Sequence, residues 1–165
     1  MADTQRRFSV LGINTFQILN KIASNQRICR LLKYQVRDPF SKEREDVDGL
    51  ELIGKQILVV PKIYDDSIEK MSYITAIFDN YSVNIHNPEF KLASIRFDIA
   101  CPYDEWMLDE SSLRPYLIMQ EIDTMFNQKK LSGIGNMQFV NAQALTLSPQ
   151  IGGYSMRYQI NEFNR

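Results

Sequence analysis

The sequence has few of the residues on which metal and nucleophilic chemistry depend. Its 165 residues include one histidine and two cysteines. The single histidine, His86, excludes a multi-histidine metal site and leaves little scope for a histidine-based triad. Cys29 and Cys101 lie far apart and belong to no CxxC motif, so neither a zinc site nor a disulfide framework is expected. We predict that both thiols are reduced and buried in the core.

The sequence also lacks an excess of either charge and lacks a long hydrophobic run. Nineteen Lys and Arg residues face twenty Asp and Glu residues, for a formal net charge of −1. This balance gives no general attraction for nucleic acid or for an anionic membrane. Arg6 and Arg7 precede an apolar stretch, residues 8–13, that imitates the start of a signal peptide, but the stretch is too short and Asn14 interrupts it. No segment is apolar and long enough to span a bilayer, and no membrane partner is expected.

Motifs that bind nucleotides or activate a serine are missing. Gly133 and Gly135 begin no GxGxxG pattern and follow a predicted helix, so they are interpreted as a helix stop. Adjacent acids occur at residues 65–66, 104–105 and 109–110, and converging carboxylates can hold a cation or act as acid and base. Adjacent acids in loops usually face water, and no calcium-loop spacing is present. We therefore expect no cofactor and no metal.

The apolar content predicts one folded domain. With 44% hydrophobic residues, the chain can bury one sizeable core. We expect residues 1–165 to form a single domain with an exposed polar loop at about residues 37–49. No internal repeat or low-complexity tract divides the chain.

A helix pair is predicted near the N-terminus. From Asn14 to Tyr34, apolar residues recur at spacings of three and four, which is typical of helices packed on one side. Ser24 and Asn25 disturb this phase and can cap a second helix that begins near Gln26. The predicted buried face consists of Phe16, Leu19, Ile22, Ala23, Ile28, Leu31 and Leu32.

One later helix is marked by its own start and stop signals. Ser111 and Ser112 can cap it, and Pro115 suits its first turn. Lys129 and Lys130 favour its C-terminal end. Its predicted apolar face consists of Leu117, Ile118, Ile122, Met125 and Phe126.

Several strands are predicted between and after the helices. The clearest is residues 94–101, where Ile95, Phe97 and Ile99 alternate with polar neighbours. Residues 148–153 contain a proline and a Gly-Gly pair and predict a turn into a last amphipathic strand, residues 154–160. The other predicted strands are residues 56–60, 73–78, 81–85 and 137–147. The order predicts an α+β fold, with a mainly antiparallel sheet packed against the helix pair and one long helix.

Cations concentrate between the second predicted helix and the polar loop. Arg27, Arg30 and Lys33 could present a basic strip to a phosphate backbone or to acidic loops of a neighbouring subunit. A solvated helix face is the simpler interpretation. Their partners could also be intramolecular, because residues 43–48 are rich in acids.

The order of these elements resembles the neck and tail-terminator proteins of tailed bacteriophages. The closing half, residues 96–158, matches in its strand, loop, helix and final hairpin. Residues 22–32 with Asp38 and Pro39 resemble the helix pair and following loop of head-to-tail joining proteins. The short motifs that carry the resemblance are Arg114-Pro115-Tyr116, Gly133-Ile134-Gly135 and Gly153-Tyr154.

The resemblance implies a structural protein of the virion, assembled in the host cytoplasm. Such subunits form a ring, commonly hexameric, that joins the portal or connector side of the capsid to the tail tube and leaves a lumen for DNA. No catalytic residues are carried over. We predict that the loop meets a neighbouring subunit or a neck protein, and assembly that survives charge reversal at Arg37 and Arg44 would exclude this. The predicted contact residues are Arg37, Asp38, Phe40, Lys42 and Arg44, with Trp106 as a second anchor. A core-capping role for Trp106 is the alternative.

Three other interpretations stay open. The first is an adaptor or baseplate component of the same particle. The second is a small enzyme that uses the acidic loop at residues 104–110 with Tyr103 or Tyr116, and its mark would be a deep pocket holding a carboxylate with a raised pKa. The third is a nucleic-acid-binding module that uses the basic strip, whose affinity should fall steeply with salt.

Overall fold

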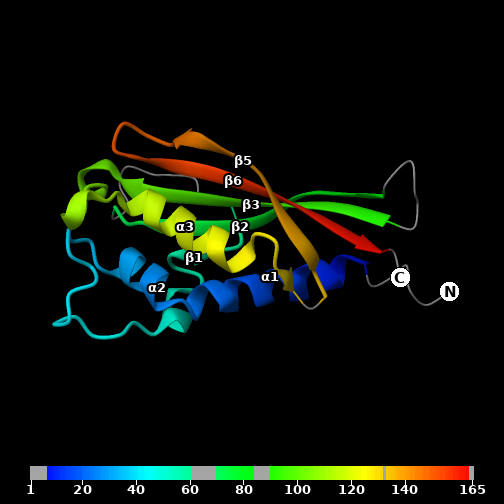
Figure 1. Cartoon of the computed structure of the whole chain (residues 1–165), viewed down its shortest axis with the longest axis horizontal. Coiled ribbons are helices and arrows are strands. Elements are labelled where there is room, and N and C mark those ends of the chain that lie inside the picture. Colours follow the sequence, from blue (N-terminus) through cyan, green and yellow to red (C-terminus); the bar gives the residue numbers. More distant parts are fainter. Residues whose placement is uncertain (1–6, 61–69, 84–89, 132, 164–165) are drawn as a thin grey trace.

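The fold is α+β, as predicted, with a six-stranded sheet covered on one face by helices (Figure 1). The computed structural model describes residues 7–60, 70–83, 90–131 and 133–163. Its helices are α1 (Arg7–Ala23), α2 (Gln26–Lys33) and α3 (Arg114–Phe126), with short 3-10 turns at Gly49–Leu52, Tyr103–Glu105 and Asp109–Ser111. Its strands are β1 (Ile57–Leu58), β2 (Tyr73–Val83), β3 (Phe90–Pro102), β4 (Lys130–Leu131), β5 (Gly135–Thr146) and β6 (Ile151–Phe163).

The helix pair forms where the sequence predicts it. Asn25 caps α2, and its side-chain oxygen accepts the backbone N–H of Ile28 at 3.2 Å. The helix α1 begins at Arg7, seven residues before the predicted start. None of the helices in the described part of the chain is long and apolar enough to cross a membrane.

The prediction is wrong for one residue of the buried helix face, Phe16. Phe16 is 58% exposed, whereas Leu19 and Ile22 are buried as predicted. The reason is angular, because each helical residue turns the direction of its side chain by about 100°. The core-facing side of α1 is centred on Ile18 and Ile22, so Phe16 points away from it.

The sheet is antiparallel except at one edge. The strand order is β1-β2-β3-β6-β5-β4, and only β1 pairs in parallel, with β2. The two predicted strands at residues 73–78 and 81–85 are one strand, β2, with a bulge between Phe78 and Asn80. The predicted strand residues 84–85 lie outside the described residues, and so does His86.

The predicted turn into the last strand is confirmed, but the Gly-Gly pair does not belong to it. The turn is limited to residues 147–150, and Gly152 and Gly153 lie inside β6, paired with Cys101 and Ala100. A Cβ on Gly153 would lie 1.8 Å from the backbone oxygen of Ile99. Only glycine therefore allows the backbones of β3 and β6 to lie this close together.

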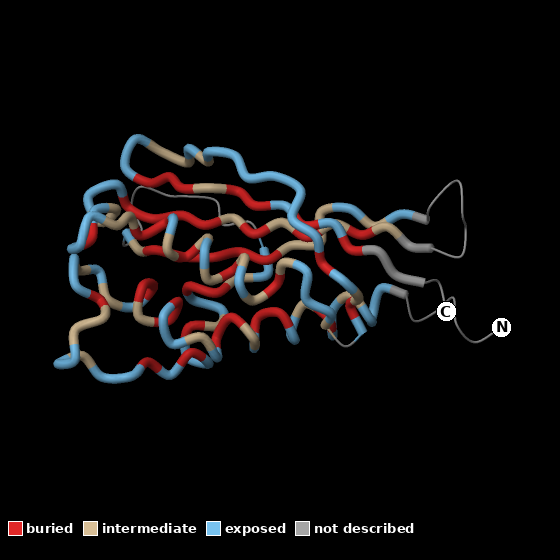
Figure 2. Tube along the Cα trace, in the orientation of Figure 1, coloured by how far each residue is buried: buried red, intermediate tan, exposed pale blue. Residues whose placement is uncertain are grey.

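The core lies between the sheet and the helices, where the buried parts of both layers face each other (Figure 2). Phe97 stacks on Phe126 of α3 with ring centroids 5.2 Å apart, and Tyr158 meets Phe97 edge-on. Both cysteines are buried and free, as predicted. The predicted serine caps of α3 are wrong, because Leu113 stands at the cap position and makes no side-chain cap bond.

Candidate assembly surfaces

The loop at residues 37–49 is held by its own side chains. Arg44 donates from Nη2 to Asp38 Oδ1 at 2.7 Å, and its guanidinium lies over the Tyr34 ring, 5.3 Å from the centroid. The hydrogen bond from Arg44 lowers the pKa of the Asp38 carboxyl. Lys42 is exposed at the surface of the loop. The loop is thus an ordered surface that presents charges of both signs.

The basic strip contacts this loop within the same chain. Arg30 donates from Nη2 to Asp46 Oδ1 at 2.9 Å and to the carbonyl oxygen of Arg44 at 3.0 Å. Arg27 pairs with Glu121 of α3 at 2.7 Å and lies over the Phe40 ring, 4.5 Å from its centroid. The predicted pairing with the acids at residues 43–48 is therefore confirmed for Arg30, whereas Arg27 pairs with an acid of α3 instead.

The remaining strip residue and the first loop residue are more exposed. Lys33 is exposed beside a hollow that Gln35, Gln56 and Met71 also line. Arg37 Nε lies 3.6 Å from Asp109 Oδ1, and both side chains are more than half exposed. An exposed pair at this distance contributes little to stability, so both groups remain available to a partner.

Trp106 belongs to a cluster of aromatic side chains at one end of the sheet. Its ring lies 5.3 Å from Tyr103 and 6.3 Å from Tyr154, measured between centroids. Its Nε1–H donates to the carbonyl oxygen of Cys101 at 3.0 Å. Tyr154 and Tyr116 share a hydroxyl hydrogen bond of 2.7 Å, and Tyr103 and Tyr116 are 39% and 47% exposed. Trp106 is therefore fixed as part of an aromatic surface.

Arg114 is a key residue that the sequence analysis noted only as part of a motif. It is completely buried, and it donates to four backbone carbonyl oxygens, those of Leu31, Tyr34, Val36 and Glu105. The first three lie at or just beyond the end of α2, so the cation satisfies carbonyls that a helix end leaves without partners. Arg114 thereby fixes the end of α2 to the segment that carries Trp106.

The acidic loop contains one carboxyl with an altered acidity. Burial raises the pKa of the Glu105 carboxyl, and the positive charge of Arg114 partly opposes this shift. Glu105 Oε2 is buried and has no hydrogen-bond partner among the described residues. Asp104, Asp109 and Glu110 are exposed. No group of three or more His, Cys, Asp or Glu side chains suited to a metal ion occurs in the described ranges.

We predict that Glu105→Gln stabilises the protein at pH 7. A carboxyl whose pKa is raised by folding loses stability on ionisation, so wild-type stability falls as the pH rises from the unfolded-state pKa through the folded-state pKa. The advantage of the variant should shrink as the pH falls and disappear below about pH 4, where the wild-type group is protonated in both states. Urea unfolding at several pH values measures this.

The exposed Glu43→Gln is the matched control and should change little at any of these pH values. A Glu105→Gln variant that is less stable than wild type at pH 7 would show that the ionised carboxylate stabilises the fold through Arg114.

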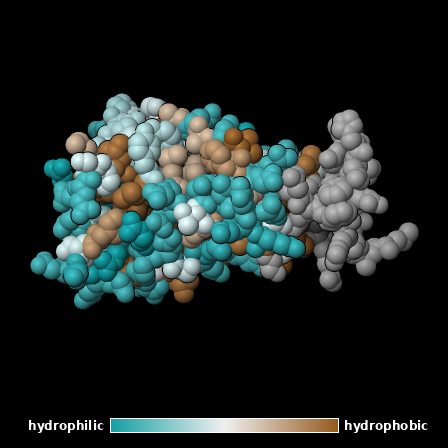
Figure 3. Space-filling model, in the orientation of Figure 1, coloured by the Kyte–Doolittle hydropathy of each residue, from teal (hydrophilic) through white to brown (hydrophobic). Residues whose placement is uncertain are grey.

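The strand β5 forms an apolar surface that sequence reasoning missed. A strand is predicted at residues 137–147, but its sequence does not show which side chains are exposed. Met137 is buried, whereas every residue from Gln138 to Ala144 is exposed, including Phe139 at 44% and Val140 at 49%. A bulge between Phe139 and Asn141 shifts the register against β6. Figure 3 shows hydrophobic side chains gathered over β5.

The outer edge of β5 is paired along only a short part of its length. β4 pairs with Gly135 and Asn136, and Asn127 Oδ1 accepts the backbone N–H of Phe139 at 3.1 Å. From Val140 to Thr146 no further strand lies on that edge among the described residues. The strand contains no charged residue, although charged side chains commonly protect exposed edges.

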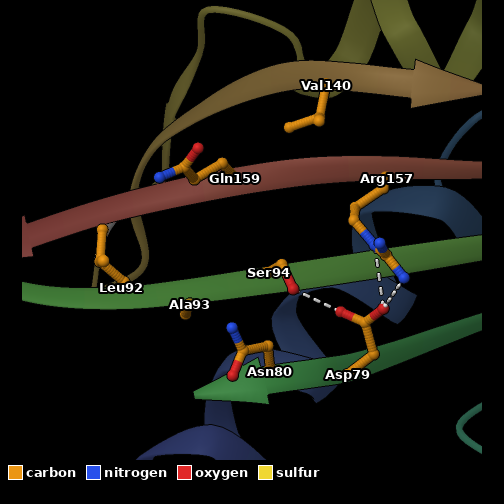
Figure 4. Close-up of a pocket in the computed structure, with 8 residues that line it drawn as sticks. All are labelled: Asp79, Asn80, Leu92, Ala93, Ser94, Val140, Arg157 and Gln159. Carbon is orange, nitrogen blue, oxygen red and sulfur yellow. Dashed lines mark hydrogen bonds and ion pairs between the residues drawn. The ribbon is translucent and has the colours of Figure 1, made fainter. Parts of the chain in front are cut away.

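The helix-free face of the sheet carries a hollow with paired charges (Figure 4). Asp79 accepts from Arg157 Nη2 at 2.7 Å and from Nε at 3.1 Å. The Ser94 hydroxyl donates to the same carboxylate at 2.5 Å. The hollow has a volume of about 360 Å³, and Asn80, Leu92, Val140 and Gln159 complete much of its lining. Because its charges neutralise each other, this face offers no strong anion site.

Comparison with protein families gives a match that covers most of the chain. The family described as YomW matches residues 25–160, a range that includes the loop, the aromatic cluster and β5. No curated protein matches the chain.

Proposed function

The chain belongs to the YomW family, which is associated with bacteriophages, and we propose that it is a structural protein of the virion. In this proposal, copies of the chain form a ring at the head-tail junction. The ring terminates the tail tube and joins it to the neck or connector of the capsid. Neither a catalytic residue nor a cofactor takes part.

The observation that carries this proposal is the exposed, uncharged edge of the sheet. A strand with unpaired backbone groups and apolar side chains is suited to contact with another protein chain. From Val140 to Thr146, no further strand pairs with the outer edge of β5 among the described residues. The exposed apolar side chains of Val140, Ala142 and Ala144 lie along this stretch, interspersed with uncharged polar ones. A subunit whose only task is assembly needs such a surface, whereas an enzyme of this size needs a cleft.

The proposed partners are further copies of the chain, the tail-tube protein and the neck proteins on the portal side. The ordered loop, with exposed Lys42 and the weak Arg37–Asp109 pair, is suited to a neck partner. Trp106 and its neighbouring tyrosines are suited to a second contact, since aromatic side chains carry much of the binding energy at interfaces. Arg27, Arg30 and Lys33 could make non-specific contact with DNA in the lumen, weakened by the intramolecular pairs of the two arginines.

Two alternatives are distinguished by different observations. An adaptor of the tail or baseplate would use the same surfaces with other partners. A small enzyme using residues 104–110 is favoured only by the raised pKa of Glu105. The hollows around Asp79, Lys33 and Asn127 are formed by other residues, so they do not supply the deep pocket that this alternative needs.

Deleting the gene from a phage that encodes this chain tests the proposal. We expect DNA-filled heads and separate tails to accumulate, because the joint between them is missing, with infectious particles reduced at least a thousandfold. Electron microscopy of the lysate measures this, and supplying the wild-type chain from a plasmid is the control. Heads accompanied by no tails at all would indicate a baseplate role instead. Normal joined particles would contradict a role in the virion.

A further inference from the structure

Two exposed surfaces on the subunit lie on elements without acidic residues. The first is β5 on the side of the sheet that carries the helices. α1 lies over β1 and β2, and α3 lies over β3, β6 and the start of β5, where Met137 is buried, so only the later part of β5 extends beyond the helix layer (Figure 1). The residues of β5 on this side are Phe139, Ala142 and Ala144, which are exposed. Small alanines leave room above the strand for an additional helix beside α3.

The second surface is the outer side of α1. Ile13 and Phe16 are 59% and 58% exposed, and Val10 is 43% exposed on the same helix. The helix contains no acidic residue, and its basic residues are Arg7 and Lys21. Its inner side, by contrast, is buried in the core through Ile18 and Ile22. α1 therefore exposes apolar side chains on the side away from the core, interspersed with the polar Gln17 and Asn20, as in a helix that contacts a second body of protein.

We infer that the outer side of α1 in one subunit packs on β5 of the next subunit, beside the neighbour's α3. This inference rests on the proposed ring and identifies the surfaces that form it. The partner on β5 is a second copy of the chain, because the chain itself provides both parts of the contact. These parts are the portion of β5 that its own helices leave uncovered and the exposed apolar side chains of α1. Charge agrees, since neither surface brings an acidic group into the contact.

The positions of the two surfaces determine the kind of assembly. In Figure 1, α1 runs along one side of the molecule, and the exposed half of β5 lies on the opposite side. A contact between two different surfaces is heterologous. Any open row of subunits joined in this way has one unused surface of each kind, one at either end. Such a contact closes only in a ring, whereas a contact of one surface with itself would stop at a dimer.

Two single substitutions test which surfaces meet. Ile13→Asp places a charge on the outer side of α1, and Ala142→Asp places one on β5. Both residues are exposed in the subunit, so each variant should fold like wild type by circular dichroism. Leu50→Asp is the matched control, because Leu50 is 65% exposed and lies in the 3-10 turn outside both surfaces.

Native mass spectrometry or light scattering then compares the proteins alone and mixed. We expect wild type and Leu50→Asp to form the same ring, and each test variant to lose self-association at least tenfold. A mixture of the two test variants should form a 1:1 dimer and nothing larger, because only one intact pair of surfaces remains.

The other results overturn the inference in distinguishable ways. Rings from either test variant would show that other surfaces form the ring, and the proposed function would stand. A dimer formed by one test variant alone would show that its intact surface binds itself. Wild-type protein that never associates, even with tail-tube or connector protein present, would overturn the inference together with the ring.

Discussion

Replacing Arg114 by methionine should lower the free energy of unfolding by about 3–5 kcal/mol, because several buried carbonyl oxygens lose a charged hydrogen-bond donor at once. The side chain is completely buried and binds the carbonyl oxygens of Leu31, Tyr34, Val36 and Glu105. Methionine fills much of the volume but donates no hydrogen bond, so all four carbonyls lose this partner. Urea unfolding followed by circular dichroism measures the change.

Two control variants separate the hydrogen bonds from the charge. Arg114→Lys keeps the charge but cannot reach carbonyls on several sides at once, so it should recover only part of the loss. Arg27→Met removes an exposed arginine that pairs with Glu121, and it should cost under about 1 kcal/mol. An Arg114→Met variant as stable as wild type would show that Arg114 does not fix the end of α2.

Replacing Gly153 by alanine should reduce the free energy of unfolding by about 3 kcal/mol, near the upper end for overpacking a core. The added Cβ would lie 1.8 Å from the backbone oxygen of Ile99, on the strand that pairs with β6. Because the obstacle is backbone in the middle of the sheet, β3 and β6 must move apart. Thermal unfolding measures the change.

Gly12→Ala is the matched control, with an effect of opposite sign. Nothing lies within 4 Å of a Cβ at Gly12, which is inside α1. Alanine is about 1 kcal/mol more favourable than glycine in a helix interior, so this variant should be more stable than wild type. A Gly153→Ala protein that matches wild type would show that β3 and β6 can separate without cost.

Local sequence patterns predicted the elements whose side chains alternate between core and solvent. Ile95, Phe97 and Ile99 are buried as their alternation predicts, and Asn25 caps α2 as its position predicts. These features depend on neighbours within one element, which periodicity describes well. The α+β fold followed from their order.

Features set by contacts between distant segments were not predictable in this way. Gly152 and Gly153 look like a turn in sequence, but their role comes from β3 and Tyr103, which are distant along the chain. Phe16 and Phe139 look like core residues, yet no helix or strand of the described chain covers them. Arg114 looks like an ordinary surface arginine, and its burial depends on α2 ending beside it. The available signal for exposed assembly surfaces was the excess of apolar residues in two elements, of which α1 has no acidic residue and β5 has no charged residue at all.

The central claim is that this phage-associated chain forms a ring. The most direct test is the mass of the purified protein in solution, measured over a wide range of concentration and with added tail-tube or connector protein. The proposed function predicts a discrete ring-sized oligomer, formed alone or induced by one of these partners. A monomer that persists at every concentration and ignores both partners would contradict it.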